Sequence, residues 1–334
     1  MKTTLPSGYH ARPARMDDLE AAVEMFNLDA RNLIGVDMFI LQEEGNEWQT
    51  PGFNLATDSQ VVLTEDDQLV GYYRVWDMKP HVTLYVGGRV HPEHTGRGIA
   101  TYLLEWARER ASQSLPKAPP EARVIMQCFV ITLNQAALKL FEDAGMQLTR
   151  YFHHMVIDLD GPPPAPQWPP GIEVRELVYD RDEWPLTLAM VEAFKDHWGF
   201  VERPIEEDHE RWMHNVRNND DFDPSLCYLA WDGDQLAGAS ICWPYAHEDR
   251  DMGWVDELGV RKPWRNRGLG LALLHHSFGE FYRRGKRSVG LGVDAENLTG
   301  ALRLYERAGM HPDPERQYAV FELELRPGQD LRTR

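Results

Sequence analysis

The pattern of apolar and polar positions predicts strands and helices in mixed order. Apolar runs near His10–Ala14 and Ile172–Glu176 predict a first strand, and helical periodicity follows each. The segments SQVVLTEDDQLVGYYRV, from Ser59, and SLCYLAWDGDQLAGASIC, from Ser225, each predict two strands joined by an Asp-rich turn, which is a hairpin. The stretch LALLHHSFGEFYRR after Gly270 predicts an amphipathic helix. These elements indicate an α/β fold of α+β character, with a mixed sheet and helices on its faces.

The same order of elements occurs twice along the chain. VGGRVHPEHTGRGIATYLL, from Val86, matches DELGVRKPWRNRGLGLALL, from Asp256. QCFVITLNQAALKLFEDAGM, from Gln127, matches LGVDAENLTGALRLYERAGM, from Leu291. A glycine that is the expected left-handed cap follows the last helix of each copy, at Gly145 and Gly309. Three matched blocks, the hairpins included, at a near-constant offset predict a tandem repeat of one domain.

A proline-rich segment separates the two copies. GPPPAPQWPPG, from Gly161 to Gly171, cannot continue a helix or a central strand, so it predicts a linker. A length of 334 residues fits two domains of about 150 residues. We therefore predict an N-terminal domain at 1–160, a linker at 161–170 and a C-terminal domain at 171–334.

Composition narrows the class of protein. The chain is 43% hydrophobic and 26% charged, which is typical of a globular protein, and no apolar run is long enough for a membrane helix. The first residues lack the apolar block of a secretion signal, and the three cysteines, Cys128, Cys227 and Cys242, lie in apolar strand-like runs. These features favour a cytoplasmic location with reduced, buried thiols, and a cysteine nucleophile is the alternative.

The formal charge of −18 argues against nucleic acid or an anionic membrane as partner. An acidic surface serves solubility or attracts a cationic acceptor. The histidine pairs at 153–154 and 275–276 lack the spacing of metal ligands, so we predict no metal.

The segment from Val255 to Leu274 combines a strand, a basic turn and a helix. Amide groups at a helix N-terminus and the helix dipole both favour an anion such as a phosphate. Glycines at 268 and 270 allow close approach of a ligand, and Arg265 and Arg267 add positive charge for a diphosphate. A simple tight turn between strand and helix is the alternative interpretation.

The turn Arg265-Asn266-Arg267-Gly268-Leu269-Gly270 resembles the acyl-CoA signature (R/Q-x-x-G-x-G/A) of the GNAT superfamily of N-acetyltransferases. The preceding strand, the run from Asn297 to Tyr305 and the Ala-Gly-Met ending occur at that family's spacing. The resemblance covers both halves, so the fold it implies is a tandem repeat of two GNAT-like acyl-CoA N-acyltransferase domains. The tandem layout, with Asp-His-Trp-Gly at 196–199, most resembles mycothiol synthase and its tandem relatives.

The resemblance implies acetyl-CoA as co-substrate. In such folds the strand before the turn diverges from the next strand, here Ser288–Asp294, and its exposed edge pairs with the pantetheine arm. Asn297 either contacts CoA or caps the following helix. The residues then expected to bind the cofactor are Leu258, Gly259, Val260, Arg265, Asn266, Arg267, Gly268, Leu269, Gly270, Leu271 and Asn297.

Transfer to an amine requires a base and benefits from an acid. Strand alternation places Asp256 on the face of Leu258, with Glu257 on the opposite face, so we predict Asp256 as the base and Glu257 as the alternative. A bulge in this strand would exchange the two. Tyr305 matches the family's tyrosine and would protonate the CoA thiolate, although packing also explains a tyrosine there.

Acceptor contacts are predicted from the connection between the first helices. Asp196, His197 and Trp198 border the acceptor side in relatives, and Trp254 is added as a weaker candidate. Trp212, Trp243 and Trp254 with the acidic run 206–208 form either an aromatic, anionic pocket for an amine or ordinary core and surface.

The first copy departs from this pattern. Thr95 occupies the leading basic position, Phe141 replaces the tyrosine, and no carboxylate matches Asp256. A second CoA site would use Arg97, Gly98, Ala100 and Asn134. We predict that this copy is catalytically silent.

The function predicted from sequence is acetyl transfer from acetyl-CoA to a primary amine of a small molecule, by direct attack in the C-terminal domain. The alternatives are a non-catalytic CoA-binding sensor or scaffold, and a protein N-acetyltransferase.

Overall fold

The computed structural model of the protein describes residues 4–297 and 300–333. Contacts between residues divide the chain into two compact units. Unit 1 comprises Met1–Arg150 and Tyr318–Leu331, and unit 2 comprises Tyr151–Gln317 and Arg332–Arg334. Within the described residues, no helix is both long and apolar enough to span a bilayer.

Unit 1 contains a mixed sheet in the order β1-β2-β3-β4-β5, completed by part of β12 beside β5. Only the β4–β5 pair is parallel. Helices α1 and α2 lie on one face, where Trp48 of α2 stacks on Tyr72, and α4 lies on the other, against Gly71. The elements are β1 (Tyr9–Arg12), α1 (Leu19–Ile34), α2 (Leu41–Trp48), α3 (Leu55–Asp58), β2 (Ser59–Thr64), β3 (Leu69–Asp77), β4 (Thr83–Val90), α4 (Ile99–Ser112), β5 (Val124–Ile131) and α5 (Gln135–Asp143).

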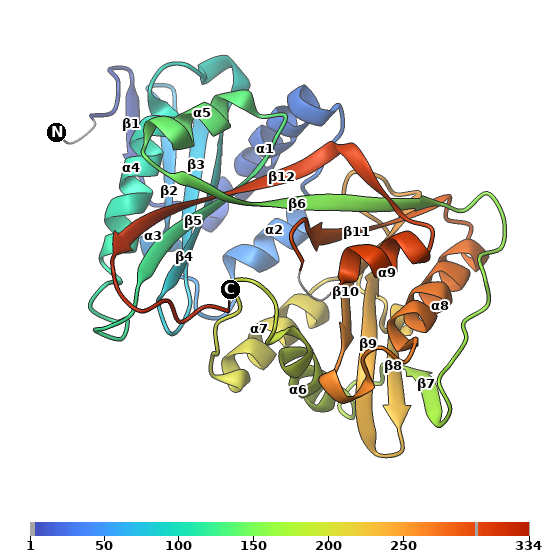
Figure 1. The fold of residues 1–334 in the computed structure, drawn as a ribbon. Helices are drawn as coiled ribbons and strands as arrows, with labels where there is room; N and C mark the ends of the chain where they lie inside the picture. Colours follow the sequence, from blue (N-terminus) through green and yellow to red (C-terminus); the bar gives the residue numbers. More distant parts are fainter. Residues whose placement is uncertain (1–3, 298–299, 334) are drawn as a thin grey trace. The chain divides into compact units, whose positions relative to one another are not determined.

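Unit 2 repeats this arrangement, with the sheet order β7-β8-β9-β10-β11 and part of β6 beside β11 (Figure 1). Only β10 and β11 are parallel. The elements are β7 (Ile172–Glu176), α6 (Glu183–Phe194), α7 (Ile205–Arg217), β8 (Cys227–Asp232), β9 (Gln235–Trp243), β10 (Met252–Val260), α8 (Leu269–Arg283), β11 (Ser288–Asp294) and α9 (Ala301–Arg307). The hairpins β2–β3 and β8–β9, the mixed sheet and the left-handed glycines at 145 and 309 confirm the sequence predictions.

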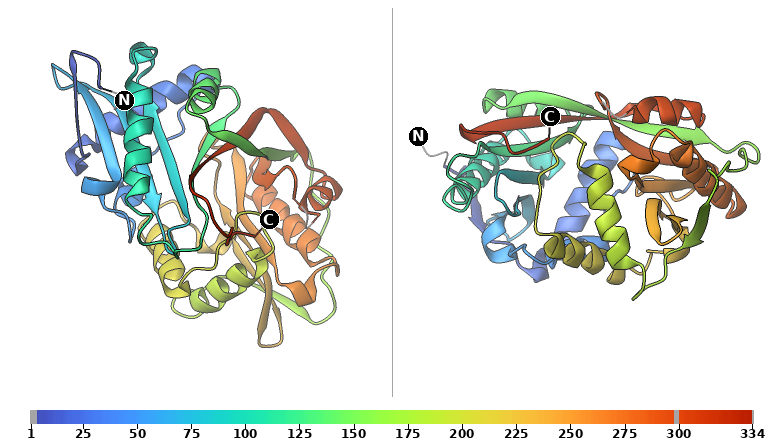
Figure 2. Two further views of the ribbon diagram at one scale, coloured as in Figure 1. Left: turned by 60° about the vertical axis from the view of Figure 1, so that its left-hand side comes forward. Right: turned by 60° about the horizontal axis from the view of Figure 1, so that its bottom comes forward.

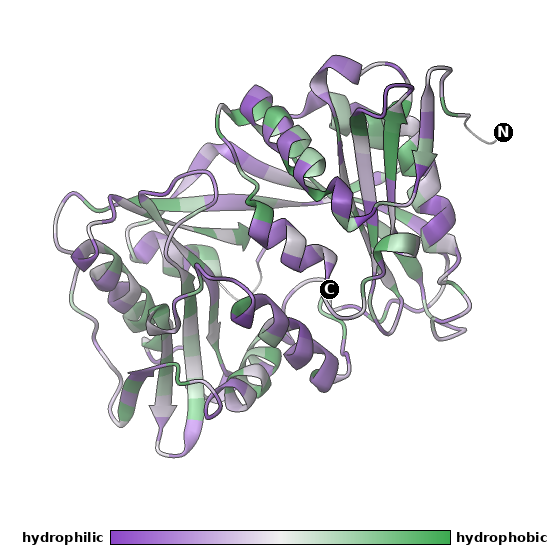
Figure 3. Cartoon of the chain, turned by 180° about the vertical axis from the view of Figure 1, so that it is seen from behind, coloured by the Kyte–Doolittle hydropathy of each residue, from purple (hydrophilic) through white to green (hydrophobic). Residues whose placement is uncertain are grey.

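Two layers of helices enclose the sheet of unit 2. Helices α6 and α7 pack against Leu229 and Ile241, and α8 packs against the neighbouring residues Tyr228 and Ala230, which face the other way. Figure 2 shows the strands of this unit between α6 and α8. In Figure 3 the helices carry both purple and green, as expected for elements with one face in the core and one in solvent.

Two strands have residues in both units. Strand β6 (Gln147–Asp158) begins in unit 1, and its residues 152–158 pair with β11 of unit 2. Strand β12 (His311–Arg326) begins in unit 2, and its residues 318–326 pair with β5 of unit 1. The contacts thus divide the chain at other points than the segment 161–170, which forms neither helix nor strand. A repeat marks matching halves, but it does not reveal which half completes which sheet.

Candidate active site

The parallel strands β10 and β11 diverge, as predicted. They pair from Met252 to Trp254 with Ser288 to Gly290, and then separate. Beyond Trp254, β10 continues to pair with β9, and β11 continues to pair with β6. One edge of β10 from Val255 to Val260 is therefore left without a strand, which is the geometry that a pantetheine arm requires.

The turn after β10 opens into a cavity of about 830 Å³. Two residues of the turn have left-handed backbone, Asn266 with φ 60° and Gly268 with φ 87°, and α8 begins directly after Gly268. An added Cβ at Gly268 would meet no atom within 4 Å, so this position faces open space. At Gly270 a Cβ would lie 3.1 Å from the side chain of Leu304, so α8 and α9 pack closely at that glycine.

Most residues predicted to bind the cofactor line this cavity, which we call the turn cavity. They are Leu258, Gly259, Val260, Arg265, Asn266, Gly268, Leu269, Gly270 and Leu271. Arg267 is exposed and does not line the cavity, and Asn297 lines a neighbouring cavity instead. The Asn297 side chain accepts a hydrogen bond from the Ala301 amide at 3.3 Å. Leu298 and Thr299, in the matched motif, lie outside the described residues.

The guanidinium group of Arg265 forms hydrogen bonds with other groups of the protein. It donates to the carbonyl oxygens of Val260 and Ala193, at 3.0 and 2.8 Å, and to the Asp196 carboxylate at 2.6 Å. These bonds connect the turn to the end of α6. We therefore expect Arg265 to hold the turn in shape as well as to contribute charge to it.

Two arginines on α9 were missed at the level of sequence. Arg303 and Arg307 line the turn cavity and are exposed, so they bring positive charge to its wall. Their i, i+4 spacing places both side chains on one face of a helix, and this spacing could have indicated a basic face from the sequence.

A β-bulge separates the two candidate bases. The register of β10 against β9 shifts between Val255 and Glu257, so Asp256 is the additional residue. Asp256 lines a cavity of about 200 Å³, which we call the transfer cavity. Glu257 lines a different cavity of about 260 Å³ between β10 and the helices α6 and α7.

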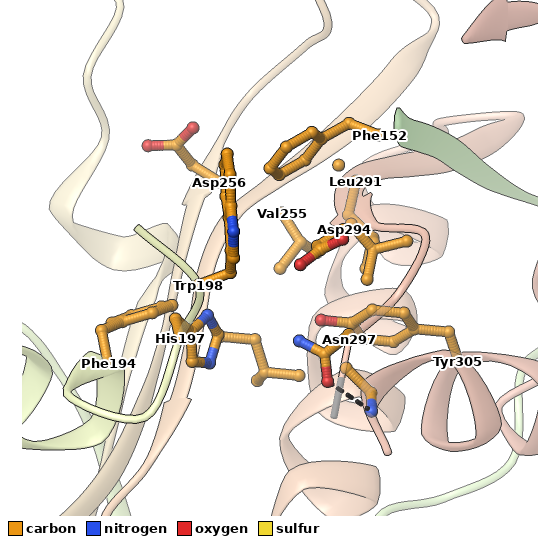
Figure 4. Close-up of a pocket in the computed structure, with 14 residues that line it drawn as sticks. Phe152, Phe194, His197, Trp198, Val255, Asp256, Leu291, Asp294, Asn297 and Tyr305 are labelled. Atoms are coloured by element: carbon orange, nitrogen blue, oxygen red, sulfur yellow. Dashed lines mark hydrogen bonds between the residues drawn. The ribbon is translucent and has the colours of Figure 1, made fainter. Parts of the chain in front are cut away.

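The transfer cavity and the turn cavity share part of their walls. Leu258, His197, Ala301 and Tyr305 line both. In Figure 4 the Tyr305 hydroxyl points toward the middle of the transfer cavity, while the Asp256 carboxyl group is turned away from it. The two predicted catalytic groups therefore lie on one cavity but are not in direct contact in this view.

Burial perturbs the titratable groups in this region. It raises the pKa of Tyr305 to about 12, so the phenol keeps its proton at neutral pH. Loss of hydration raises the pKa of Asp256, and hydrogen bonds from the indoles of Trp254 and Trp243 oppose that shift. Loss of hydration also raises the pKa of Glu257 to about 8, and the nearby Asp256 charge adds to the effect.

The predicted acceptor residues have different surroundings. His197 stacks edge-on against Phe194, and burial together with the nearby Arg265 charge lowers its pKa, so the imidazole is neutral. Trp198 lines the transfer cavity. Asp196 is bonded to Arg265, which lowers the pKa of that carboxyl group. Trp254 is not on the cavity wall, and its indole donates to Asp256 at 3.3 Å.

In unit 1 the corresponding turn makes internal contacts. Arg97 donates to the Tyr9 hydroxyl at 3.0 Å and to the Glu93 carbonyl oxygen at 2.9 Å. Gly98, with φ 84°, begins α4, which also carries Ala100. Asn134 caps α5 by accepting from the Ala137 amide at 3.0 Å. The turn shape is present, but the arginine and asparagine predicted to bind CoA are bonded to protein groups.

The cysteines are poor candidates for nucleophiles. All three are buried, and burial raises the pKa of each thiol, for Cys242 to about 11. A thiolate is therefore disfavoured. In the described part of the chain, no group of three His, Cys, Asp or Glu side chains is placed to hold a metal ion.

Comparison with known proteins places this site in a family. Residues 20–146 and 188–310 both match the model of the acetyltransferase (GNAT) family. The mycothiol acetyltransferase of Streptomyces scabiei is 30% identical over 254 residues, which is 75% of each chain. That of Geodermatophilus obscurus is 32% identical over 272 residues, which is 76% of this chain and 77% of its own.

Solved structures agree with the family match. A GCN5-related N-acetyltransferase from Sphaerobacter thermophilus shares 35% identity with a TM-score of 0.77, over 98% of this chain and 99% of its own. A tandem GNAT protein from the clavulanic acid biosynthesis pathway shares the fold, with 16% identity and a TM-score of 0.68 over 96% of this chain and 100% of its own. The chain therefore belongs to the acetyltransferase (GNAT) family, as a tandem N-acetyltransferase whose co-substrate is acetyl-CoA.

Proposed function

We propose that unit 2 transfers the acetyl group of acetyl-CoA directly to the primary amine of a small molecule. The observation that carries the proposal is the shared wall of the two cavities. A CoA diphosphate held at the Gly268 turn directs the thioester along the free edge of β10, toward Leu258 and Tyr305. An acceptor in the transfer cavity then approaches the same point from the other side.

In this reaction the amine nitrogen bonds to the thioester carbonyl carbon, and the carbon–sulfur bond breaks. The nitrogen must first be neutral, because an alkylammonium has no lone pair. Asp256 accepts the amine proton through water, since its carboxyl group is turned away from Tyr305. Tyr305 donates its phenolic proton to the departing CoA sulfur, and the raised pKa keeps that proton available. The acetylated nitrogen then loses a second proton, which restores the phenol of Tyr305, so the products are the amide, the CoA thiol and the one proton taken up by Asp256.

Asp256 is favoured over Glu257 because it shares a cavity with Tyr305, whereas Glu257 lines another one. A small acceptor is favoured because the transfer cavity holds only about 200 Å³. The relatives named mycothiol acetyltransferase support the same class of acceptor. We also propose that unit 1 is silent, because Phe141 has no proton to donate at the position of Tyr305.

A screen of primary amines with acetyl-CoA, measured as release of free thiol, tests this proposal. We expect turnover with at least one small amine and its strong reduction in Asp256→Asn. Acetyl-CoA binding without turnover on any amine would instead support a sensor or scaffold. Turnover confined to peptide amines would support a protein N-acetyltransferase.

A further inference from the structure

A second cavity of about 260 Å³ lies against the opposite side of β10 from α8. Its walls come from α6, α7, the segment between them and the strands β9 and β10. The alternation of side chains along β10 agrees with this side. An added Cβ at Gly259, two residues after Glu257, would meet Met190 of α6, whereas Val260 packs with the residues under α8. This cavity has no part in the proposed transfer step.

Aromatic side chains and a glutamate without a described partner characterise this cavity, which we call the α6–α7 cavity. Phe194, Phe200 and Trp212 line it together with the carboxyl group of Glu257. The other charged residues on its wall are Arg203 and Asp208, whose charged groups lie 3.9 Å apart, and Asp208 also pairs with Arg211. Within the described residues, Glu257 makes neither a hydrogen bond nor an ion pair.

Aromatic side chains beside a carboxylate form a favourable environment for an alkylammonium ion. The negative face of each ring attracts a cation, and the effect is largest when the cation has left water. The volume is below the range of about 300–1,000 Å³ for pockets that hold drug-sized ligands, so it suits one compact group. Phe194 lines both this cavity and the transfer cavity, so the two adjoin.

We propose that the α6–α7 cavity binds an alkylammonium group and thereby anchors a second positive charge carried by the acceptor. This inference rests on the proposed function, and it narrows the acceptor to amines with two cationic groups. One nitrogen reacts in the transfer cavity, and the other is held between Glu257 and the aromatic rings. The high negative charge of the chain, −18, favours the approach of such a cation.

The protonation of Glu257 provides an independent signature. With a pKa of about 8, the carboxyl group of the empty cavity is mostly protonated at pH 7. A bound cation favours the carboxylate, so binding at pH 7 should be accompanied by proton release. The neighbouring charged groups are Asp256 on β10, Arg203 and Asp208, with His209 behind Thr187.

Calorimetry with choline as the probe tests the proposal. The matched neutral probe is 3,3-dimethyl-1-butanol, which replaces the charged nitrogen by carbon. We expect choline to bind more tightly than the neutral probe, with proton release at pH 7. Glu257→Gln and Trp212→Leu should each weaken choline binding by about tenfold or more, and Glu257→Gln should abolish the proton release. Asp256→Asn, which removes a neighbouring charge but no part of the cavity wall, should change choline affinity much less than Glu257→Gln does.

Equal affinities for the two probes, or unchanged choline binding in both Glu257→Gln and Trp212→Leu, would overturn the proposal. Loss of binding in Asp256→Asn alone would do the same, because the cation would then occupy the transfer cavity. The experiments distinguish failure of this proposal from failure of the proposed acetyl transfer. Choline binding can be measured without turnover, and an absence of choline binding would leave acetylation of simple monoamines intact.

Discussion

Replacement of Tyr305 by phenylalanine is the most direct test of the transfer step. The side chain is only 8% exposed, and its hydroxyl makes no hydrogen bond with another described residue. Removal of the oxygen therefore leaves no buried group without its partner, and we expect stability to change by less than about 0.5 kcal/mol. A positioned general acid contributes roughly 10²–10⁴-fold to a rate. The expected loss of turnover corresponds to about 2.7–5.5 kcal/mol of transition-state stabilisation.

The assay is release of CoA thiol, measured under single-turnover conditions so that product release does not hide the chemical step. We expect the affinity for acetyl-CoA to remain within about twofold, because Tyr305 is not part of the Gly268 turn proposed to hold the diphosphate. Tyr282→Phe is a matched control, since Tyr282 lies on α8, is 39% exposed and lines neither cavity. Full single-turnover activity of Tyr305→Phe would refute the assignment of the acid.

Three further predictions concern the turn and the strand. Gly268→Trp should abolish acetyl-CoA binding in calorimetry. Gly98→Trp in unit 1 is the matched control, since Gly98 has a similar left-handed backbone (φ 84°), and it should preserve binding. If both variants changed the affinity for acetyl-CoA equally, the cofactor would not bind at the Gly268 turn. Asp256→Asn should lower turnover on a monoamine by roughly 10²-fold or more, whereas Glu257→Gln should preserve it, and the reverse result would exchange their roles. Between about pH 4.5 and 8, Glu257 keeps its proton in the folded state but has lost it in the unfolded chain. The free energy of unfolding should therefore fall as the pH rises through this range. Denaturant titrations of Glu257→Gln should show a smaller dependence on pH.

Local signals made much of the fold predictable. The Asp-rich turns of both hairpins, the glycine caps and the glycine-containing turn before α8 each depend on a few neighbouring residues, and the structure has all of them. The cavity around Gly268 follows from the same turn. The divergence of β10 and β11 was predictable only through the family resemblance, because no local pattern encodes it.

Contacts between distant residues limited the prediction of the site. Arg265 was assigned to the diphosphate because of its charge, but its guanidinium bonds to Asp196 and Ala193, about 70 positions away in the sequence. Alternation of side chains along β10 predicts that Asp256 and Glu257 lie on opposite faces of the strand. The cavity that each residue lines depends on the bulge and on the surrounding helices, which the sequence does not reveal. Of the residues considered for an aromatic pocket, Trp212 and Asp208 line the α6–α7 cavity, whereas Trp243 and Trp254 do not.

Strands β6 and β12 each complete the sheet of the unit formed mainly by the other half of the sequence, and one mutation in each strand tests this. Phe321 belongs to the second half of the sequence, yet it is 2% exposed, and its ring lies 5.5 Å from Phe141 in unit 1. Met155 precedes the linker, yet it is fully buried in the core of unit 2. Truncation of such side chains costs about 3–5 kcal/mol for phenylalanine and 2–5 kcal/mol for methionine. Hydrogen exchange should therefore show weaker protection of β4 and β5 in Phe321→Ala, and of β10 and β11 in Met155→Ala. If each variant loosened its own half of the sequence instead, the strand exchange would be wrong, because the energy of a buried side chain is lost where it packs.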